Sequence, residues 1–157
     1  MAAPKIKWPK PDAAYTVPLY GGEVYLFKTI SKLQSASRFL SSAADIDFSG
    51  LLGCVTYYTR NSNGNRIYCV GVFDNSLTTL VHECSHVALS ISETVGIKPT
   101  ESCGEPFCYL IDNIFDVLSK PFKPTIKVKP KKPVKKLPPI ELVYPDLLKG
   151  ATDTYED

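Results

Sequence analysis

The stretch His82-Glu83-Cys84-Ser85-His86 lies near the middle of residues 77–95, and this segment decides how the rest of the chain is interpreted. Residues 74–76 offer three possible helix N-caps, Gly96 is a natural residue to follow a helix, and Pro99 stops its continuation. The segment is therefore predicted to be one helix. Two histidines four residues apart lie on one helix face, with Cβ atoms about 6 Å apart, so both imidazoles can reach a single metal ion.

These two histidines, the only ones in the chain, are expected on the solvent side of the helix. At about 100° per residue, His82 and His86 point almost opposite to an apolar stripe, so they are not predicted to be core residues. An exposed, solvated pair is the structural alternative. The apolar stripe consists of Leu80, Cys84, Val87, Ala88, Ile91 and Val95.

A catalytic zinc site needs a third protein ligand and an open position for water. Glu93 is on the histidine face but lies seven residues beyond His86, about 10 Å further along the helix axis, which is too far to share the ion. The third ligand is therefore expected from another part of the chain.

Residues 79–118, about a quarter of the chain, resemble the zinc-binding core of the gluzincin metallopeptidases. The likeness is to minimal single-domain members and to short metallopeptidase-like proteins encoded by phages. In gluzincins a glutamate from the next helix, commonly some eighteen residues after the second histidine, is the third ligand, and eighteen residues separate His86 from Glu105. The run Gly104-Glu105-Pro106-Phe107 also resembles the Asn-Glu-Gly-Phe segment of the aminopeptidase branch, with Gly104 in place of Asn.

The resemblance implies a hydrolase that cleaves peptides, with Zn²⁺ held by His82, His86 and Glu105. Glu83 would be the general base, taking a proton from water and passing it to the leaving amine. No third histidine exists to stabilise the oxyanion, so a tyrosine is expected to do so, and four are candidates: Tyr57, Tyr58, Tyr68 and Tyr109. Residues 102–105 also match the capping-box pattern, which would give Glu105 a structural role at the helix N-terminus instead. The proline that follows Glu105 argues against the capping role, because proline prefers the first position of a helix.

Two non-catalytic interpretations use the same histidines. His82, His86, Cys103 and Cys108 could close a tetrahedral structural zinc site with no open position, which would make the protein a binding module. Alternatively, an inactive zincin scaffold could bind a partner through the basic C-terminal segment.

All five cysteines are expected to be thiols or metal ligands rather than disulfides, because no signal peptide is recognised.

The remaining elements predict a small zincin-like α+β domain. Residues 23–28 and the pair 51–60 and 66–73 are strand-like, and the Asn-Gly step within residues 61–65 predicts a hairpin between the last two. One helix is expected at 32–44, with Ser31 as its N-cap, and another at 106–118. The result is a sheet of about three mainly antiparallel strands, packed against helices on one side.

Three regions are expected along the chain: an extended arm (1–20), the zincin-like domain (21–118) and a Lys/Pro-rich extended tail (119–157). Residues 1–118 carry nine Lys/Arg against eleven Asp/Glu, whereas 119–157 carry nine Lys against five Asp/Glu. The tail could mediate self-association or contact a protein partner, and phosphate contacts of nucleic acid are the weaker alternative. No apolar run is long enough to span a membrane, so a cytoplasmic protein is expected, in the host cytoplasm if it is phage-encoded.

Overall fold

Four strands and three helices make up the part of the chain that the computed structural model describes, namely residues 7–41, 46–60, 64–100 and 104–122. The order is β1, β2, α1, β3, β4, α2, α3. Their bounds are β1 Ala13–Thr16, β2 Glu23–Phe27, α1 Ile30–Leu40, β3 Gly53–Thr59, β4 Arg66–Val72, α2 Leu77–Thr94 and α3 Gly104–Ser119.

The sheet is mixed and has the strand order β1-β2-β4-β3. The predicted hairpin is confirmed, because β3 and β4 pair antiparallel from Gly53 opposite Val72 to Thr59 opposite Arg66. The expectation of about three mainly antiparallel strands matches only roughly. β4 lies between β3 and β2 and pairs with β2 in parallel, and a fourth strand, β1, pairs antiparallel with the outer side of β2. Both β1 and β3 are therefore edge strands.

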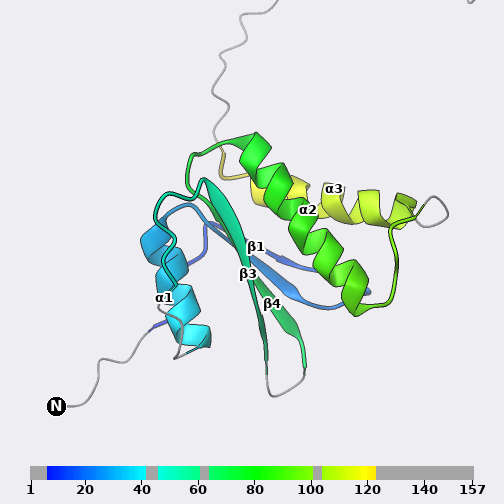
Figure 1. Ribbon diagram of the computed structural model, residues 1–157, viewed down its shortest axis with the longest axis horizontal. Coiled ribbons are helices and arrows are strands. Elements are labelled where there is room, and N and C mark those ends of the chain that lie inside the picture. The colour runs from blue at the N-terminus through cyan, green and yellow to red at the C-terminus, as the bar shows by residue number, and fades with distance from the viewer. Residues whose placement is uncertain (1–6, 42–45, 61–63, 101–103, 123–157) are drawn as a thin grey trace, which may run out of the picture. The chain divides into compact units, whose positions relative to one another are not determined.

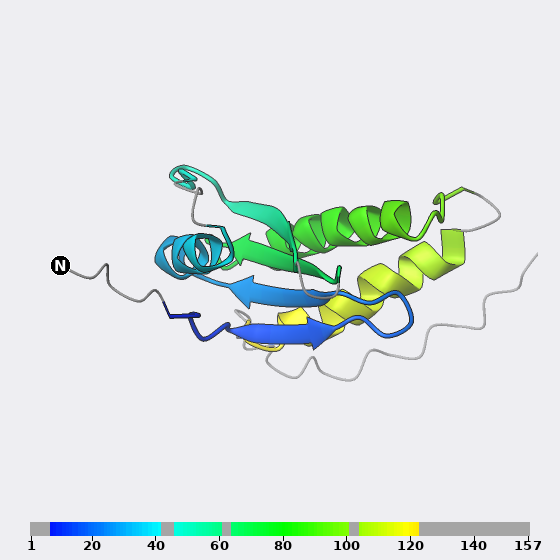
Figure 2. The same cartoon turned by 90° about the horizontal axis from the view of Figure 1, so that it is seen from below.

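Helices cover both faces of the sheet, so the expectation that they lie on one side is wrong. Figures 1 and 2 show α1 on one face and α2 with α3 on the other. The strands alternate accordingly: Val70 and Val72 of β4 belong to the core under α2 and α3, whereas Ile67 and Cys69 belong to the core under α1. Alternate side chains of a strand point to opposite faces, and because this sheet is buried on both, its central strands carry almost no polar residues.

Helix α2 begins where the sequence allows several N-caps, and the structure selects Ser76. Its hydroxyl oxygen accepts hydrogen bonds from the backbone N–H groups of Thr78 and Thr79, at 3.1 and 3.4 Å. Helix α1 begins earlier than predicted, after Thr29, and ends at Leu40 because the next residue is extended. The predicted end of α1 at residues 42–44 lies outside the described residues.

The packed body extends past both ends of the predicted domain. Strand β1 lies within the segment expected as an extended arm, and Asp12 just before it bonds to the backbone N–H of Lys28 at 2.8 Å and to Nζ of Lys32 at 2.7 Å. After α3, Phe122 is 8% exposed and packs in the core, with Nζ of Lys28 4.3 Å from its ring centre. The rest of the expected tail, 123–157, lies outside the described residues. None of the described helices combines the length and hydropathy that a membrane span requires.

Candidate functional site

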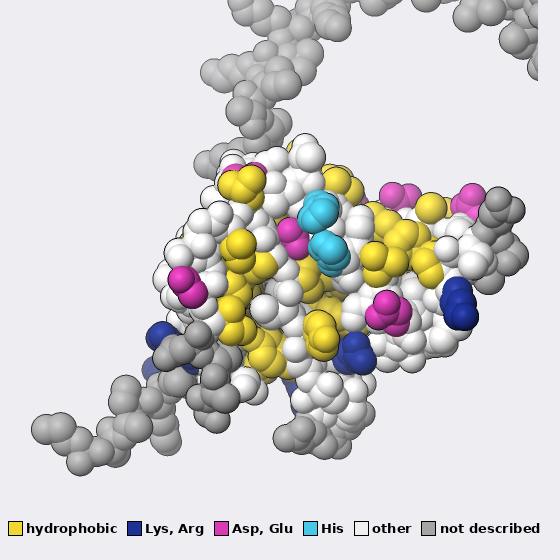
Figure 3. Space-filling view, in the orientation of Figure 1, with side chains coloured by type: hydrophobic (Ala, Val, Ile, Leu, Met, Phe, Trp, Pro, Cys, Tyr) yellow, Lys and Arg dark blue, Asp and Glu magenta, His cyan; other side chains and the backbone are white. Residues whose placement is uncertain are grey.

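The two imidazoles converge on one point at the surface of α2. Nε2 of His82 and Nε2 of His86 are 3.1 Å apart, and their rings are nearly perpendicular at 84°. Two nitrogens at the tetrahedral positions of one zinc ion, each about 2.05 Å from it, would lie roughly 3.3 Å apart. Both residues are exposed, as the helix periodicity predicted, and Figure 3 shows them side by side on one face of the molecule. The pair therefore has the separation of two metal ligands, and the same distance also permits an imidazole–imidazole hydrogen bond.

Glu83 lines the same groove as the histidines and is buried against the edge strand β3. It is only 6% exposed, and Gly53 of β3 lies directly over it, since a Cβ atom on Gly53 would be 2.7 Å from Oε1 of Glu83. Burial raises the pKa of the Glu83 carboxyl above its ordinary value, while charge on His82 and His86 acts in the opposite direction. No hydrogen-bond donor within the described ranges reaches this carboxylate, so its acceptor capacity is free for water or a ligand.

A groove of about 460 Å³ runs between β3 and α2. Gly53, Val55 and Tyr57 alternate along β3 and form one wall, because residues two apart point to the same face. His82, His86 and Ser90 follow one another at four-residue intervals and form the other wall, because residues four apart lie on one helix face. Glu83 lies at the base, and Leu51 closes the end nearest the N-terminus of α2. The site is thus a helix face set against an unpaired strand edge.

Glu105 does not join the histidines in the described structure. It is exposed in the first turn of α3, which begins beside the C-terminal end of α2 and runs back along it (Figures 1 and 2). That end of α2, at Thr94, is eight residues beyond His86, or about 12 Å along the helix. Across the four described ranges, no three His, Cys, Asp or Glu side chains are grouped so that they could hold a metal ion. Of the three expected ligands, the described structure brings only His82 and His86 together.

The cysteines divide between the core and the surface. Cys84 is fully buried in the apolar stripe, as predicted, and burial raises the pKa of its thiol to about 12. Cys54, Cys69, Cys84 and Cys108 are all free thiols. Of the two cysteines in the alternative structural zinc site, Cys108 is exposed on α3, and Cys103 lies outside the described residues.

Of the four tyrosines considered for the oxyanion, only Tyr57 lines the groove. It is 62% exposed, and its ring is covered on one side by the guanidinium of Arg66. Tyr68 is 1% exposed in the core, Tyr58 packs on the opposite face under α1, and Tyr109 lies on α3 beside a different pocket.

Sequence reasoning did not place Gly53 or Ser90 in this site, nor Arg66 next to it. Ser90 had a usable signal, because it continues the four-residue spacing of the two histidines along α2. Gly53 and Arg66 had none, because each acquires its role through contacts between α2 and the sheet.

The described fold is an α+β domain in which a helix-borne histidine pair borders a groove at a free sheet edge. Comparison of the chain with protein-family models, with curated proteins and with solved structures found no match.

Proposed function

We propose that the protein is a zinc-dependent peptide hydrolase whose active site is the groove between β3 and α2. The observation that carries this proposal is the 3.1 Å separation of the two Nε2 atoms beside the buried carboxylate of Glu83. The imidazoles would hold the ion from one side. Bound zinc supplies a polarised substrate carbonyl and a more acidic water molecule at neutral pH.

Glu83 is proposed as the group that moves the proton. As water adds to the carbonyl carbon, a carboxylate oxygen of Glu83 accepts its proton, and the same proton passes to the amine nitrogen as the C–N bond breaks. A carboxylate held in a partly desolvated position is a stronger base than one in water, which fits the raised pKa of Glu83. Gly53 limits the movement of this side chain from the opposite wall.

The edge of β3 is the proposed binding surface for the peptide. β3 pairs with β4 on one side only, so half of its backbone N–H and C=O groups face outward along the groove. An extended peptide can pair with such an edge as an added strand, which places one of its carbonyl groups next to the histidines. This arrangement favours a peptide substrate over a compact small molecule.

Metal analysis and peptide cleavage, measured together on matched variants, test the proposal. The wild-type protein should bind one zinc ion and cleave a mixture of unstructured peptides. His82→Gln and His86→Gln should each lose the metal, whereas Glu83→Gln should keep both metal and fold and lose cleavage by at least about 100-fold. Cleavage by Glu83→Gln at the wild-type rate, or unchanged zinc binding by both histidine variants, would refute the assignment.

Glu105→Gln tests the third ligand separately. That Glu105 is a ligand stays a prediction, and the described position of α3 does not support it. Helix α3 begins near the C-terminal end of α2, about two helical turns beyond His86. Unchanged zinc affinity in this variant would show that the ion is held without Glu105. A loss comparable to that of a histidine variant would show that the first turn of α3 reaches the metal.

A non-catalytic zinc-binding module is the second candidate, because the converging histidine pair could also belong to a closed site with two further protein ligands. Such a protein would bind zinc stoichiometrically and cleave no peptide. If Cys103 and Cys108 complete the site, the Cys108→Ala variant would release zinc, whereas the catalytic proposal expects that variant to keep it.

A further inference from the structure

One arginine lies at the end of the groove that is opposite to Leu51. Arg66, the first residue of β4, donates a hydrogen bond from Nη1 to Oγ of Ser90 at 3.2 Å, and its guanidinium carbon is 5.5 Å from the ring centre of Tyr57. Ser90 and Tyr57 belong to opposite walls of the groove. Arg66 therefore contacts one residue of each wall at this end of the groove.

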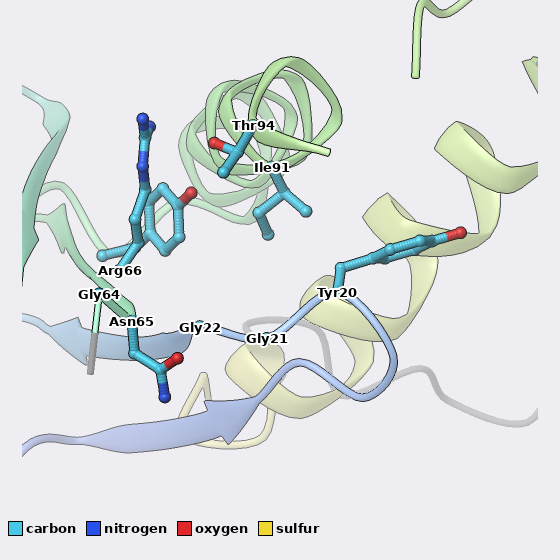
Figure 4. Close-up of a pocket in the computed structure, with 9 residues that line it drawn as sticks. Tyr20, Gly21, Gly22, Gly64, Asn65, Arg66, Ile91 and Thr94 are labelled. Carbon is cyan, nitrogen blue, oxygen red and sulfur yellow. The ribbon is translucent and has the colours of Figure 1, made fainter. Parts of the chain in front are cut away.

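The guanidinium of Arg66 is held by two neutral side chains, Ser90 and Tyr57, both of which line the groove. Arg66 also helps to line a small hollow of about 80 Å³ with Gly21 and Gly22. Figure 4 shows its side chain extending from β4 beside the last turns of α2, with the guanidinium pointing away from these two glycines. Among the described residues, no carboxylate forms a salt bridge with Arg66. Arg60, by contrast, is paired with Glu23 at 2.9 Å on the α1 side of the sheet.

A positioned guanidinium that meets no carboxylate in the described ranges has donors left for a ligand. The fork of an arginine offers five N–H groups, and the bond to Ser90 and the contact with Tyr57 leave several of them free. Carboxylates accept two such donors in parallel, which gives both strength and geometric selection. The guanidinium end of the groove is thus suited to a carboxylate.

We propose that Arg66 selects peptides that carry a carboxylate at this end of the groove, either an acidic side chain or a free C-terminus. This inference rests on the proposed function and names its substrate class. Ser90 is one helical turn beyond His86, about 6 Å along α2, and an extended peptide advances about 3.3 Å per residue. The carboxylate therefore belongs two or three residues from the residue whose carbonyl lies at the histidines.

Binding measurements on the zinc-loaded, full-length Glu83→Gln protein test this without cleavage. Fluorescently labelled octapeptides would carry one Glu at each successive position, with the matching Gln peptides as neutral references and amidated C-termini. A further neutral peptide would be compared as free acid and as amide, to separate an acidic side chain from a terminal carboxylate. We expect about tenfold tighter binding when the carboxylate meets Arg66, the gain of one charge-assisted pair.

Substitution of the arginine decides whether that gain comes from Arg66. Arg66→Met keeps the aliphatic stem and should abolish the carboxylate preference, whereas Arg60→Met removes the same charge on the opposite face and should preserve it. Arg66→Glu should reverse the preference toward a Lys peptide, and a thermal melt of each variant verifies the fold.

The outcomes separate this inference from the proposed function. Peptides that bind with no carboxylate preference, or with a preference that survives in Arg66→Met, would overturn the role of Arg66 while leaving the groove as a peptide site. Binding of none of the peptides would overturn both the role of Arg66 and the peptide hydrolase proposal.

Discussion

Gly53 and Glu83 touch across the boundary between the sheet and α2, and each restricts what the other position can hold. A Cβ atom at position 53 would lie 2.7 Å from Oε1 of Glu83 and 2.5 Å from Cγ2 of Thr79. The missing side chain is what lets α2 approach the edge strand so closely. The close approach in turn buries the carboxylate that the proposed chemistry requires.

Gly53→Ala should therefore damage both stability and the site. The added methyl overlaps Thr79 and Glu83, so we expect a loss of about 1–3 kcal/mol in the free energy of unfolding, measured by urea denaturation. Gly104→Ala is the matched control, because a Cβ atom there meets nothing within 4 Å. Equal stability of the two variants would mean that α2 can move away from β3 at no cost.

Asp12 should make stability depend on pH in the acid range. Burial by itself would raise the pKa of Asp12, but the hydrogen bonds from Lys32 and from the Lys28 N–H, with the charges of both lysines, outweigh burial and hold the pKa below its ordinary value. The pKa of this carboxyl is thus lower in the folded state than in the unfolded state, where it is near 3.9. Its contribution to stability is fully present above the unfolded-state pKa and is lost as the pH falls through the folded-state pKa.

Asp12→Asn measures this contribution. We expect the variant to lose roughly 1 kcal/mol of unfolding free energy at pH 7, and the difference from wild type to shrink as the pH falls below about 4. Asp116→Asn is the control, since Asp116 and Lys120 form an exposed pair at 3.7 Å. A difference between Asp12→Asn and wild type that persists unchanged at pH 2 would contradict the electrostatic explanation.

Phe122 should mark the true end of the packed body. A chain that ends at Lys123 should unfold like the full-length protein, whereas one that ends at Leu118 should lose about 2–3 kcal/mol, because it removes a ring that is 8% exposed in the core. Thermal unfolding of both truncations, together with Phe122→Ala in the full chain, measures the effect. Equal stability of the two truncations would show that the ring contributes nothing.

Local sequence patterns predicted the elements that local physics controls. The bounds of α2 followed from the N-cap candidates at residues 74–76 and from Gly96, and the exposure of its histidines followed from the 3.6-residue period. The hairpin of β3 and β4 followed from two strand-like runs around a tight reversal. Strand β1 was missed because four residues with half-exposed side chains carry too weak a pattern, and its strand state depends on pairing with β2.

The site could be predicted only in part, because some of its residues are placed by tertiary contacts rather than by local sequence. The sequence by itself determined that His82 and His86 share one exposed helix face, because residues four apart on a helix are neighbours whatever surrounds them. Only the tertiary structure decided that Glu83 is buried beneath Gly53, that Arg66 contacts Ser90 and Tyr57, and that Glu105 lies in the first turn of α3. Strand order and helix packing bring together residues distant in sequence, and no local period encodes those distances.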